Sequence, residues 1–136
     1  MIDSSSRSLR CVIVTPEETV LDKTAEFIAL PLYDGELGVG LGHAPMIGRL
    51  GCGELRIVEG GRTERFYLDG GFVQVAGNVT SILTNRALPV ARLNAPGIEK
   101  TLEETARRRA AGDEQLRLRE RDLQQLRAQL RVARKR

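Results

Sequence analysis

The sequence predicts a β + α protein, in which an N-terminal antiparallel β-sandwich is followed by a C-terminal antiparallel two-helix hairpin. Three observations lead to this prediction. Up to about Thr84 the chain consists of short runs rich in β-branched residues, and turns containing glycine separate the runs. After Asn85 the strand pattern fades into a stretch with two prolines. Beyond Gly97 glycine almost vanishes, and apolar residues repeat at helical spacing.

Short strands are expected throughout the first half. In FVQVA, for example, Val73 and Val75 alternate with residues of the opposite face, and in ELRIVE Leu55 and Ile57 do the same. Pro31 cannot donate a hydrogen bond to a neighbouring strand, so its strand is expected to lie at a sheet edge or to contain a bulge. Closely spaced strands with tight turns favour a sandwich or barrel over a parallel sheet. The expected strands are residues 9–14, 25–32, 46–50, 54–59, 62–68, 72–76 and 79–84.

Two helices are expected after the linker. Gly112 followed by Asp113 predicts the end of one helix and the N-cap of the next, with a turn of about two residues. Each helix carries a thin apolar stripe, so the hairpin should bury little apolar surface by itself. The first stripe is Ile98, Leu102, Ala106 and Ala110. The second is Leu116, Leu123 and Leu130 every seven residues, with Arg119, Leu126 and Ala133 at the other seam position.

Charge divides the chain near the same place as the strand and helix patterns. Residues 1–97 carry nine Lys/Arg and eleven Asp/Glu, a net −2, whereas residues 98–136 carry twelve and seven, a net +5. The first residues show neither a signal peptide nor a transit peptide, and no run of eighteen apolar residues could span a bilayer. We expect a disordered tail (1–8), a β-sandwich (9–86), a linker (87–97) and a helical hairpin (98–136).

The residues do not indicate an enzyme. The chain has one histidine, no local context for a Ser-His-Asp or Cys-His site, and no HExxH, CxxC or EF-hand motif. Cys11 and Cys52 lack metal-ligand spacing, no disulfide between them is expected, and Cys11 should be a small buried apolar residue. The sequence therefore predicts no catalytic, metal or cofactor site, and a reducing compartment.

The stretch YDGELGVGLGHAP, residues 33–45, contains four glycines and the single histidine. A phosphate-binding loop is excluded, because the third glycine of a G-x-G-x-x-G counted from Gly38 would fall at His43, and because strands are expected on both sides. His43 is either a turn histidine whose ring bonds a nearby carbonyl or an exposed contact residue. The arginines of the helices fit an acidic protein surface better than nucleic acid, since no aromatic side chains interleave them.

The blocks GELGVGLGHAP, LGCGELRI and GGFVQVAGNVTSIL, in this order and spacing, resemble the epsilon subunit of F-type proton-translocating ATP synthase. The resemblance runs from about Leu9 to Arg134. It implies a subunit of the rotating central stalk, whose sandwich docks on the gamma subunit and on the membrane c-ring. By this resemblance the c-ring-facing loop is Asp34, Gly35, Glu36, Leu37 and Gly38, and the gamma-facing residues are Gly42, His43, Ala44 and Pro45.

The same resemblance implies that the hairpin is an inhibitor with two positions. Folded down it lies on the sandwich, and extended it inserts beside gamma, meets the catalytic beta and the alpha subunits, and blocks ATP hydrolysis. Contacts to an acidic loop of beta are expected from Arg117, Arg119, Arg121, Arg127 and Arg131. Some family members bind ATP through an I/L-D-x-x-R-A motif. Asn94 and Gly97 break this motif here, so no tight ATP binding and no other cofactor are expected.

The resulting prediction is a non-catalytic rotor subunit that couples c-ring rotation to gamma and inhibits hydrolysis. Such a subunit would be peripheral, at the cytoplasmic face of a bacterial inner membrane, and would reach the membrane only through the complex. The alternative is a freestanding β-sandwich protein-binding module that oligomerises through its basic helices. Stable homodimers without affinity for gamma would favour that alternative.

Overall fold

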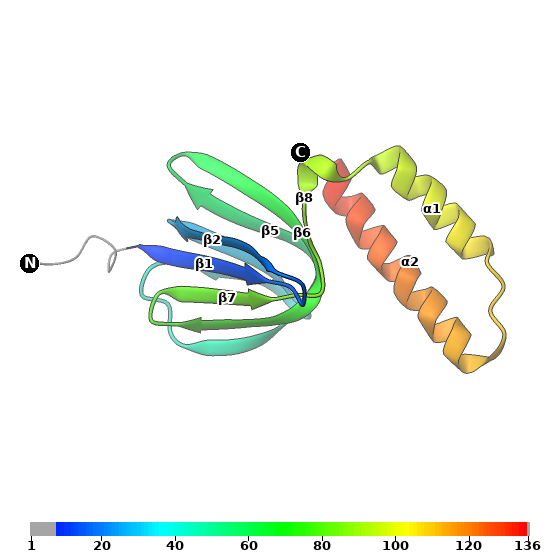
Figure 1. The fold of residues 1–136 in the computed structure, drawn as a ribbon, viewed down its shortest axis with the longest axis horizontal. Helices are drawn as coiled ribbons and strands as arrows, with labels where there is room; N and C mark the ends of the chain where they lie inside the picture. Colours follow the sequence, from blue (N-terminus) through cyan, green and yellow to red (C-terminus); the bar gives the residue numbers. More distant parts are fainter. Residues whose placement is uncertain (1–7, 136) are drawn as a thin grey trace, which may run out of the picture. The chain divides into compact units, whose positions relative to one another are not determined.

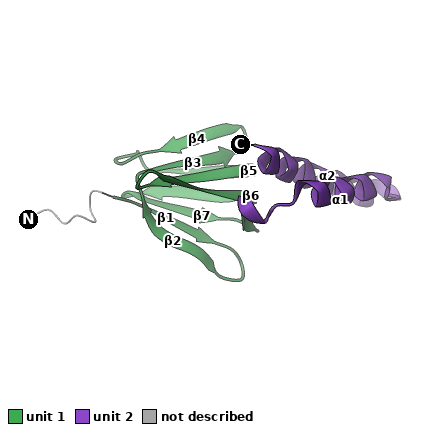
Figure 2. Cartoon of the chain, turned by 90° about the horizontal axis from the view of Figure 1, so that it is seen from above, with its two compact units in different colours: residues 1–89 green, residues 90–136 purple. Residues whose placement is uncertain are grey.

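The computed structural model describes residues 8–135 and confirms the β-sandwich followed by a helical hairpin (Figure 1). Two compact units divide the chain, residues 1–89 and 90–136 (Figure 2). The strands are β1 (Leu9–Val14), β2 (Thr19–Ala25), β3 (Phe27–Leu32), β4 (Gly35–Val39), β5 (Met46–Glu59), β6 (Arg62–Ala76), β7 (Val79–Leu83) and β8 (Ala87–Pro89). The helices are α1 (Ala95–Arg107) and α2 (Gly112–Arg134), and a single 3₁₀ turn, η2 (Val90–Arg92), precedes them.

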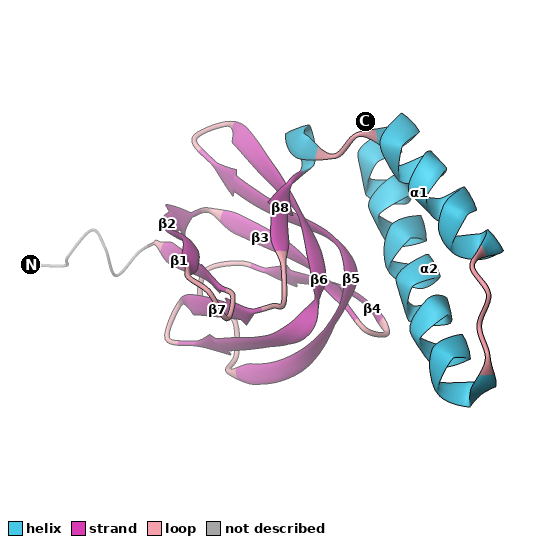
Figure 3. Cartoon of the chain, turned by 45° about the vertical axis from the view of Figure 1, so that its right-hand side comes forward, coloured by secondary structure: helices cyan, strands magenta, loops and turns pink. Residues whose placement is uncertain are grey.

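One continuous set of hydrogen-bonded strands folds over to make both layers of the sandwich (Figure 3). The strand order is β2-β1-β7-β6-β5-β3-β4, and β8 pairs with β6 beside this path. The long strands β5 and β6 pair along their whole lengths, except between the pairs Leu50↔Gly71 and Cys52↔Asp69. The first half of β5 and the second half of β6 therefore belong to one layer, together with β1, β2 and β7. The second half of β5 and the first half of β6 belong to the other layer, together with β3, β4 and β8.

The core lies between the two layers and consists of the inward residues of each strand. Leu55, Ile57, Val73 and Val75 are all buried, as the alternation of their segments predicts. Every residue of the buried cluster lies between Leu9 and Ile82, and its partly buried neighbours extend only to Ala87. The sandwich thus has a core of its own, which a unit needs in order to fold independently.

Several expected turns are strands in the structure. Residues 19–24 and 35–38, read from the sequence as connections, form most of β2 and β4 at the two ends of the strand order. The expected strands 46–50 and 54–59 are one strand, β5, and 62–68 and 72–76 are likewise one strand, β6. These segments are rich in glycine or polar residues, so their extended form depends on hydrogen bonds from neighbouring strands rather than on local propensity.

The pairings add two findings to the antiparallel arrangement that the sequence predicts. Nearly all pairs are antiparallel, but β1 and β7 run parallel, with Cys11 opposite Thr80. The strand that contains Pro31 is not at an edge, since β3 lies between β4 and β5, and its register against β5 shifts between Ala29 and Leu32. Of the two possibilities for Pro31, the bulge is the one that occurs.

The hairpin differs from expectation mainly at the helix ends. Asn94 is the N-cap of α1 and accepts a hydrogen bond from Gly97 N–H at 3.1 Å, so α1 begins at Ala95 instead of residue 98. The helix ends at Arg107, which leaves a four-residue loop, 108–111, where two residues were expected. Gly112 has a positive φ of 83°, but Asp113 is not the N-cap of α2. Ala111 takes that position, and its N–H donates to Gln115 Oε1 at 2.8 Å.

The apolar seam of the hairpin is thin and short. On α1 only Ile98 is buried, Leu102 is half-buried and Ala106 is exposed, while Ala110 lies beyond the helix end. On α2 Leu123 is buried, and Leu126, Leu130 and Ala133 are half-buried, whereas Leu116 is 40 % exposed. Arg119, which occupies a seam position, donates from Nη1 to the carbonyl of Arg108 at 2.8 Å and so satisfies a carbonyl at the end of α1.

Three further observations bear on the sequence predictions. The expected disordered tail falls almost entirely on residues 1–7, which lie outside the described part of the chain. Among residues 8–135 there is no helix with the length and apolarity needed to cross a membrane. Of the expected linker, residues 87–89 form strand β8 and pair with β6, so the chain between the sandwich and α1 is shorter than predicted.

Cys11 is a fully buried thiol, and this makes the stability of the sandwich sensitive to alkaline pH. Burial raises its pKa from 9.0 to about 12. Between these values the unfolded chain loses the thiol proton and the folded chain keeps it, so stability falls as pH rises, by about 1.4 kcal/mol per pH unit. Urea unfolding at several pH values should show a shallower decline for Cys11→Ala than for the unsubstituted chain. Parallel declines would contradict this account.

Candidate protein-docking site

The residues predicted to face the c-ring lie on the β3–β4 hairpin. Asp34 is in its turn, and the residues from Gly35 to Gly38 belong to β4, where all but the half-buried Leu37 are exposed. Glu36 is held at 3.0 Å by Arg56, whose guanidinium also bonds the buried carboxylate of Glu54 at 3.3 Å. Glu36 is therefore positioned by an arginine of β5, on the far side of β3, while the turn that contains Asp34 stays open to solvent.

The residues predicted to face gamma lie at the other end of β4, in the loop 40–45. Only Val39, the last residue of β4, and Gly40 and Leu41 lie between the two segments along the chain. Gly42, Ala44 and Pro45 are exposed and His43 is half-buried. The ring of His43 lies with Nδ1 at 2.7 Å from the carbonyl of Ala44, as expected for a turn histidine. The two predicted contact segments are thus near-consecutive stretches of the chain, one on β4 and its preceding turn and one in the loop that follows.

The outer face of one layer carries a row of exposed apolar side chains, which the sequence predictions do not include. Phe72 on β6 lies directly opposite Leu83 on β7, and on its other side opposite Arg49 on β5. Phe72 is 57 % exposed, Leu83 52 % and Ile47, two residues before Arg49 on the same face, 76 %. We call the set Tyr33, Ile47, Arg49, Phe72 and Leu83 the apolar row.

The polar members of the apolar row are suited to contact with a protein. Tyr33 N–H donates to the carbonyl of Arg49 at 2.9 Å, and the Arg49 guanidinium lies 4.3 Å from the centre of the Tyr33 ring. Arg49 makes no ion pair with another residue of the described chain. Exposed aromatic and aliphatic side chains around an unpaired arginine are the composition found at the centres of protein interfaces.

A signal for part of the row was present in the sequence. The alternation that buries Val73 and Val75 also places Phe72 on the opposite face, so an outward phenylalanine could have been inferred. The assembly of the row could not, because it depends on the pairing of β6 with β5 and β7.

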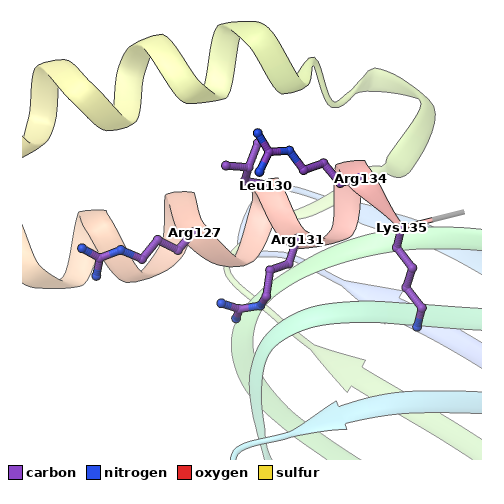
Figure 4. Close-up of a pocket in the computed structure, with 5 residues that line it drawn as sticks. All are labelled: Arg127, Leu130, Arg131, Arg134 and Lys135. Atoms are coloured by element: carbon purple, nitrogen blue, oxygen red, sulfur yellow. The ribbon is translucent and has the colours of Figure 1, made fainter.

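The five arginines predicted to meet the beta subunits do not share one environment. Arg117, Arg121, Arg127 and Arg131 are exposed on α2, over about 21 Å of helix. Arg119 is half-buried and bonded to the end of α1, so it serves the hairpin itself. Arg131 and Lys135 extend away from α1, whereas Arg134 turns toward it and pairs with Glu99 (Figure 4). Together with Arg127 and Leu130, these three line a cleft of about 620 Å³.

Within residues 8–135 there is no cluster of three or more His, Cys, Asp or Glu side chains that could hold a metal. Tyr67 donates to Asp69 Oδ1 at 3.0 Å, and burial raises the pKa of the tyrosine, which therefore keeps its proton at neutral pH. Asn94 and Gly97, which break the ATP motif, are bonded to each other at the start of α1.

Comparisons with known proteins agree with this architecture. The family described as "ATP synthase, Delta/Epsilon chain, beta-sandwich domain" matches residues 8–90. The ATP synthase epsilon chain of Rhodopirellula baltica is 48 % identical over 127 residues, which cover 93 % of this chain and 99 % of the relative.

Two solved structures are similar over most of the chain. One is a chain of the Euglena gracilis mitochondrial ATP synthase, in a structure of OSCP, F1 and the c-ring. It has a TM-score of 0.79 at 26 % identity and covers 90 % of this chain and 79 % of that one. The other is a chain of the Tetrahymena thermophila mitochondrial ATP synthase, in a structure of the central stalk and c-ring. It has a TM-score of 0.71 at 15 % identity and covers 92 % of this chain and 96 % of that one, and at this identity the similarity shows the fold alone. By its matching sandwich domain and its similarity to a relative over nearly its full length, the chain belongs to the ATP synthase epsilon chain family.

Proposed function

We propose that the chain is a non-catalytic subunit of the rotating central stalk of ATP synthase. In this role the sandwich couples rotation of the c-ring to the gamma subunit, and the C-terminal helices restrain ATP hydrolysis. Asp34 to Gly38 face the c-ring, Gly42 to Pro45 face gamma, and the complex holds the chain at the periphery of the membrane. In a bacterium this would be the cytoplasmic face of the inner membrane.

The observation that carries the proposal is the apolar row on the outer face of the sandwich. Four of its side chains expose large apolar surfaces to water, which is unfavourable unless a partner covers them. The row begins at Tyr33, next to the proposed c-ring segment, and includes Ile47, two residues after the proposed gamma-facing loop. A partner that covers the row would therefore contact the sandwich next to both segments, as a coupling subunit requires.

The hairpin supports the inhibitory part of the proposal. It is a compact unit separate from the sandwich, and its seam buries few large side chains. An element with a thin apolar contact can occupy two docked states that differ by a few kcal/mol. Its exposed arginines Arg117, Arg121, Arg127 and Arg131 are available for an acidic surface of the catalytic subunits, whereas Arg119 is proposed to act within the hairpin.

The test is ATP hydrolysis by a cognate alpha-beta-gamma core with the full chain or with a chain ending at Leu93. This end point removes the hairpin together with its N-cap, Asn94, and leaves the core of the sandwich intact. We expect suppression of hydrolysis by the full chain only, and binding to the core by both. Equal suppression would place inhibition in the sandwich. No binding by either, together with stable homodimers, would support the freestanding module instead.

A charge variant examines the arginines without shortening the chain. Arg127→Gln with Arg131→Gln should raise the concentration of chain needed for half-maximal inhibition by about 10-fold, the loss expected for two ion pairs at an interface. Arg62→Gln with Arg92→Gln removes the same charge at exposed positions outside α2 and should leave inhibition unchanged. Equal effects of both variants would indicate a general effect of net charge rather than contact through α2.

A further inference from the structure

We propose that Asn78 is a positioning residue that fixes the gamma-facing loop beside the apolar row, so that the loop and the row meet their partner as one preformed surface. The inference rests on the proposed docking function of the sandwich. Its basis is a hydrogen bond from Gly42 N–H to Asn78 Oδ1 at 2.8 Å, which joins residues 36 positions apart.

Asn78 is itself held firmly by the sheet. It forms the turn between β6 and β7 with Gly77, and both residues have positive φ, 62° and 56°. This is the conformation of a type I′ hairpin turn, which asparagine tolerates better than most residues. The Asn78 carbonyl also accepts a hydrogen bond from Arg10 N–H on β1 at 2.9 Å. The side-chain oxygen therefore projects from a backbone that two neighbouring strands and a tight turn hold in place.

The loop has little else to define its position. Of the hydrogen bonds found in the described chain, the one to Asn78 alone connects residues 40–45 with another segment. The others are internal, from His43 N–H to the Gly40 carbonyl at 3.3 Å and from the His43 ring to Ala44. Gly42 has a positive φ of 79°, which glycine adopts readily, and its N–H donates to Asn78 in the β6–β7 turn. Without the Asn78 oxygen, no hydrogen bond found in the described chain would join the loop to another segment.

This bond places the loop on the same framework as the apolar row. The turn that carries Asn78 connects the two strands that carry Phe72 and Leu83, and the loop leads directly into the strand that carries Ile47. A loop ordered before binding loses less conformational entropy when a partner covers it. Loss of one such hydrogen bond should weaken binding by about 3- to 10-fold.

Two substitutions at Asn78 separate the oxygen from the backbone conformation. Asn78→Gly keeps the positive φ and removes the acceptor, whereas Asn78→Asp keeps both. In the full-length chain, Asn78→Gly should speed hydrogen exchange of the Gly42 amide by about 10-fold and leave the thermal midpoint within about 3 °C. Its affinity for the alpha-beta-gamma core should fall by about 3- to 10-fold. Asn78→Asp should restore both the slow exchange and the affinity.

The outcomes distinguish this inference from the proposed function. An unsubstituted chain that does not bind the core overturns the proposed function. If the unsubstituted chain binds and Asn78→Gly binds equally well despite faster exchange at Gly42, the positioning role is wrong and the docking function stands. A failure of Asn78→Asp to restore affinity also overturns the positioning role, because the acceptor is present. So does a thermal midpoint for Asn78→Gly lowered by much more than about 3 °C, since Asn78 would then serve folding.

Discussion

Replacing Leu83 with aspartate is expected to weaken binding of the chain to an alpha-beta-gamma core by about 100-fold. Leu83 lies between Phe72 and Val14 in the pairing across β6, β7 and β1, so no cation faces the new carboxylate from a paired strand. Covering an unpaired carboxylate with an apolar partner surface is strongly unfavourable. Because the side chain is half exposed in the free chain, folding should be little affected, and binding can be measured by calorimetry or surface plasmon resonance.

Two variants control for trivial explanations of this loss. Leu83→Met keeps an apolar side chain of similar volume and should bind within about 3-fold of the unsubstituted chain. Phe27→Asp introduces the same charge at another exposed apolar residue, on β3 in the other layer. Its ring packs on Gly38 of the proposed c-ring segment, so this variant should leave binding to an alpha-beta-gamma core, which contains no c-ring, unchanged. If Leu83→Asp binds normally, the apolar row is not the docking surface, and the proposal loses the observation that carries it.

Replacing Gly71 with alanine should destabilise the sandwich by about 3 kcal/mol or more, the largest folding effect expected for a substitution of this size. A Cβ at this position would lie 1.9 Å from the carbonyl oxygen of Leu83 and 2.9 Å from Thr84 Cα. Both are backbone atoms at the end of the adjacent strand β7, and they cannot move without breaking the pairing of β6 with β7. The φ of Gly71 is also +114°, a conformation that residues with a Cβ strongly disfavour.

Two other glycines separate the steric clash from the backbone conformation. Gly61→Ala carries the strain of a positive φ in open space and should cost about 1 kcal/mol, whereas Gly40→Ala has neither the strain nor a close neighbour and should be nearly neutral. The midpoint of thermal unfolding should be lowest for Gly71→Ala, higher for Gly61→Ala and highest for Gly40→Ala. For Gly71→Ala it should be more than 10 °C below that of the unsubstituted chain. A midpoint for Gly71→Ala close to that of Gly61→Ala would mean that the backbone yields to the added methyl.

Much of the fold could be predicted because its signals are local. The alternation in FVQVA and ELRIVE identified inward residues that the structure buries, and Gly112 marked the break between the helices. The edge strands β2 and β4 were not predicted, because the interactions that make them extended are not local. Their residues have weak strand propensity, and they are extended because β1 and β3 offer them hydrogen bonds, which no local pattern records.

The candidate site was also predictable only in part. Motif order pointed to the residues 34–38 and 42–45, and the structure places the first segment on β4 with its preceding turn and the second in the loop after β4, both largely exposed. The apolar row was not predicted as a unit, because its members come from three strands and the turn after β3 and become neighbours only through register. The separate role of Arg119 was also hidden, since spacing along a helix does not show which arginine reaches the end of a neighbouring helix.

The sequence by itself determined the order of a β-sandwich and a helical hairpin, the charge of each, and the family, because these depend on residue type, period and spacing along the chain. The tertiary structure alone decided which apolar residues stay in water and what holds the loop 40–45, which we propose faces gamma. Both depend on contacts between distant segments, such as Phe72 with Leu83 and Gly42 with Asn78. Pairing register brings those residues together only after the chain has folded, so a pattern of near neighbours carries no information about them.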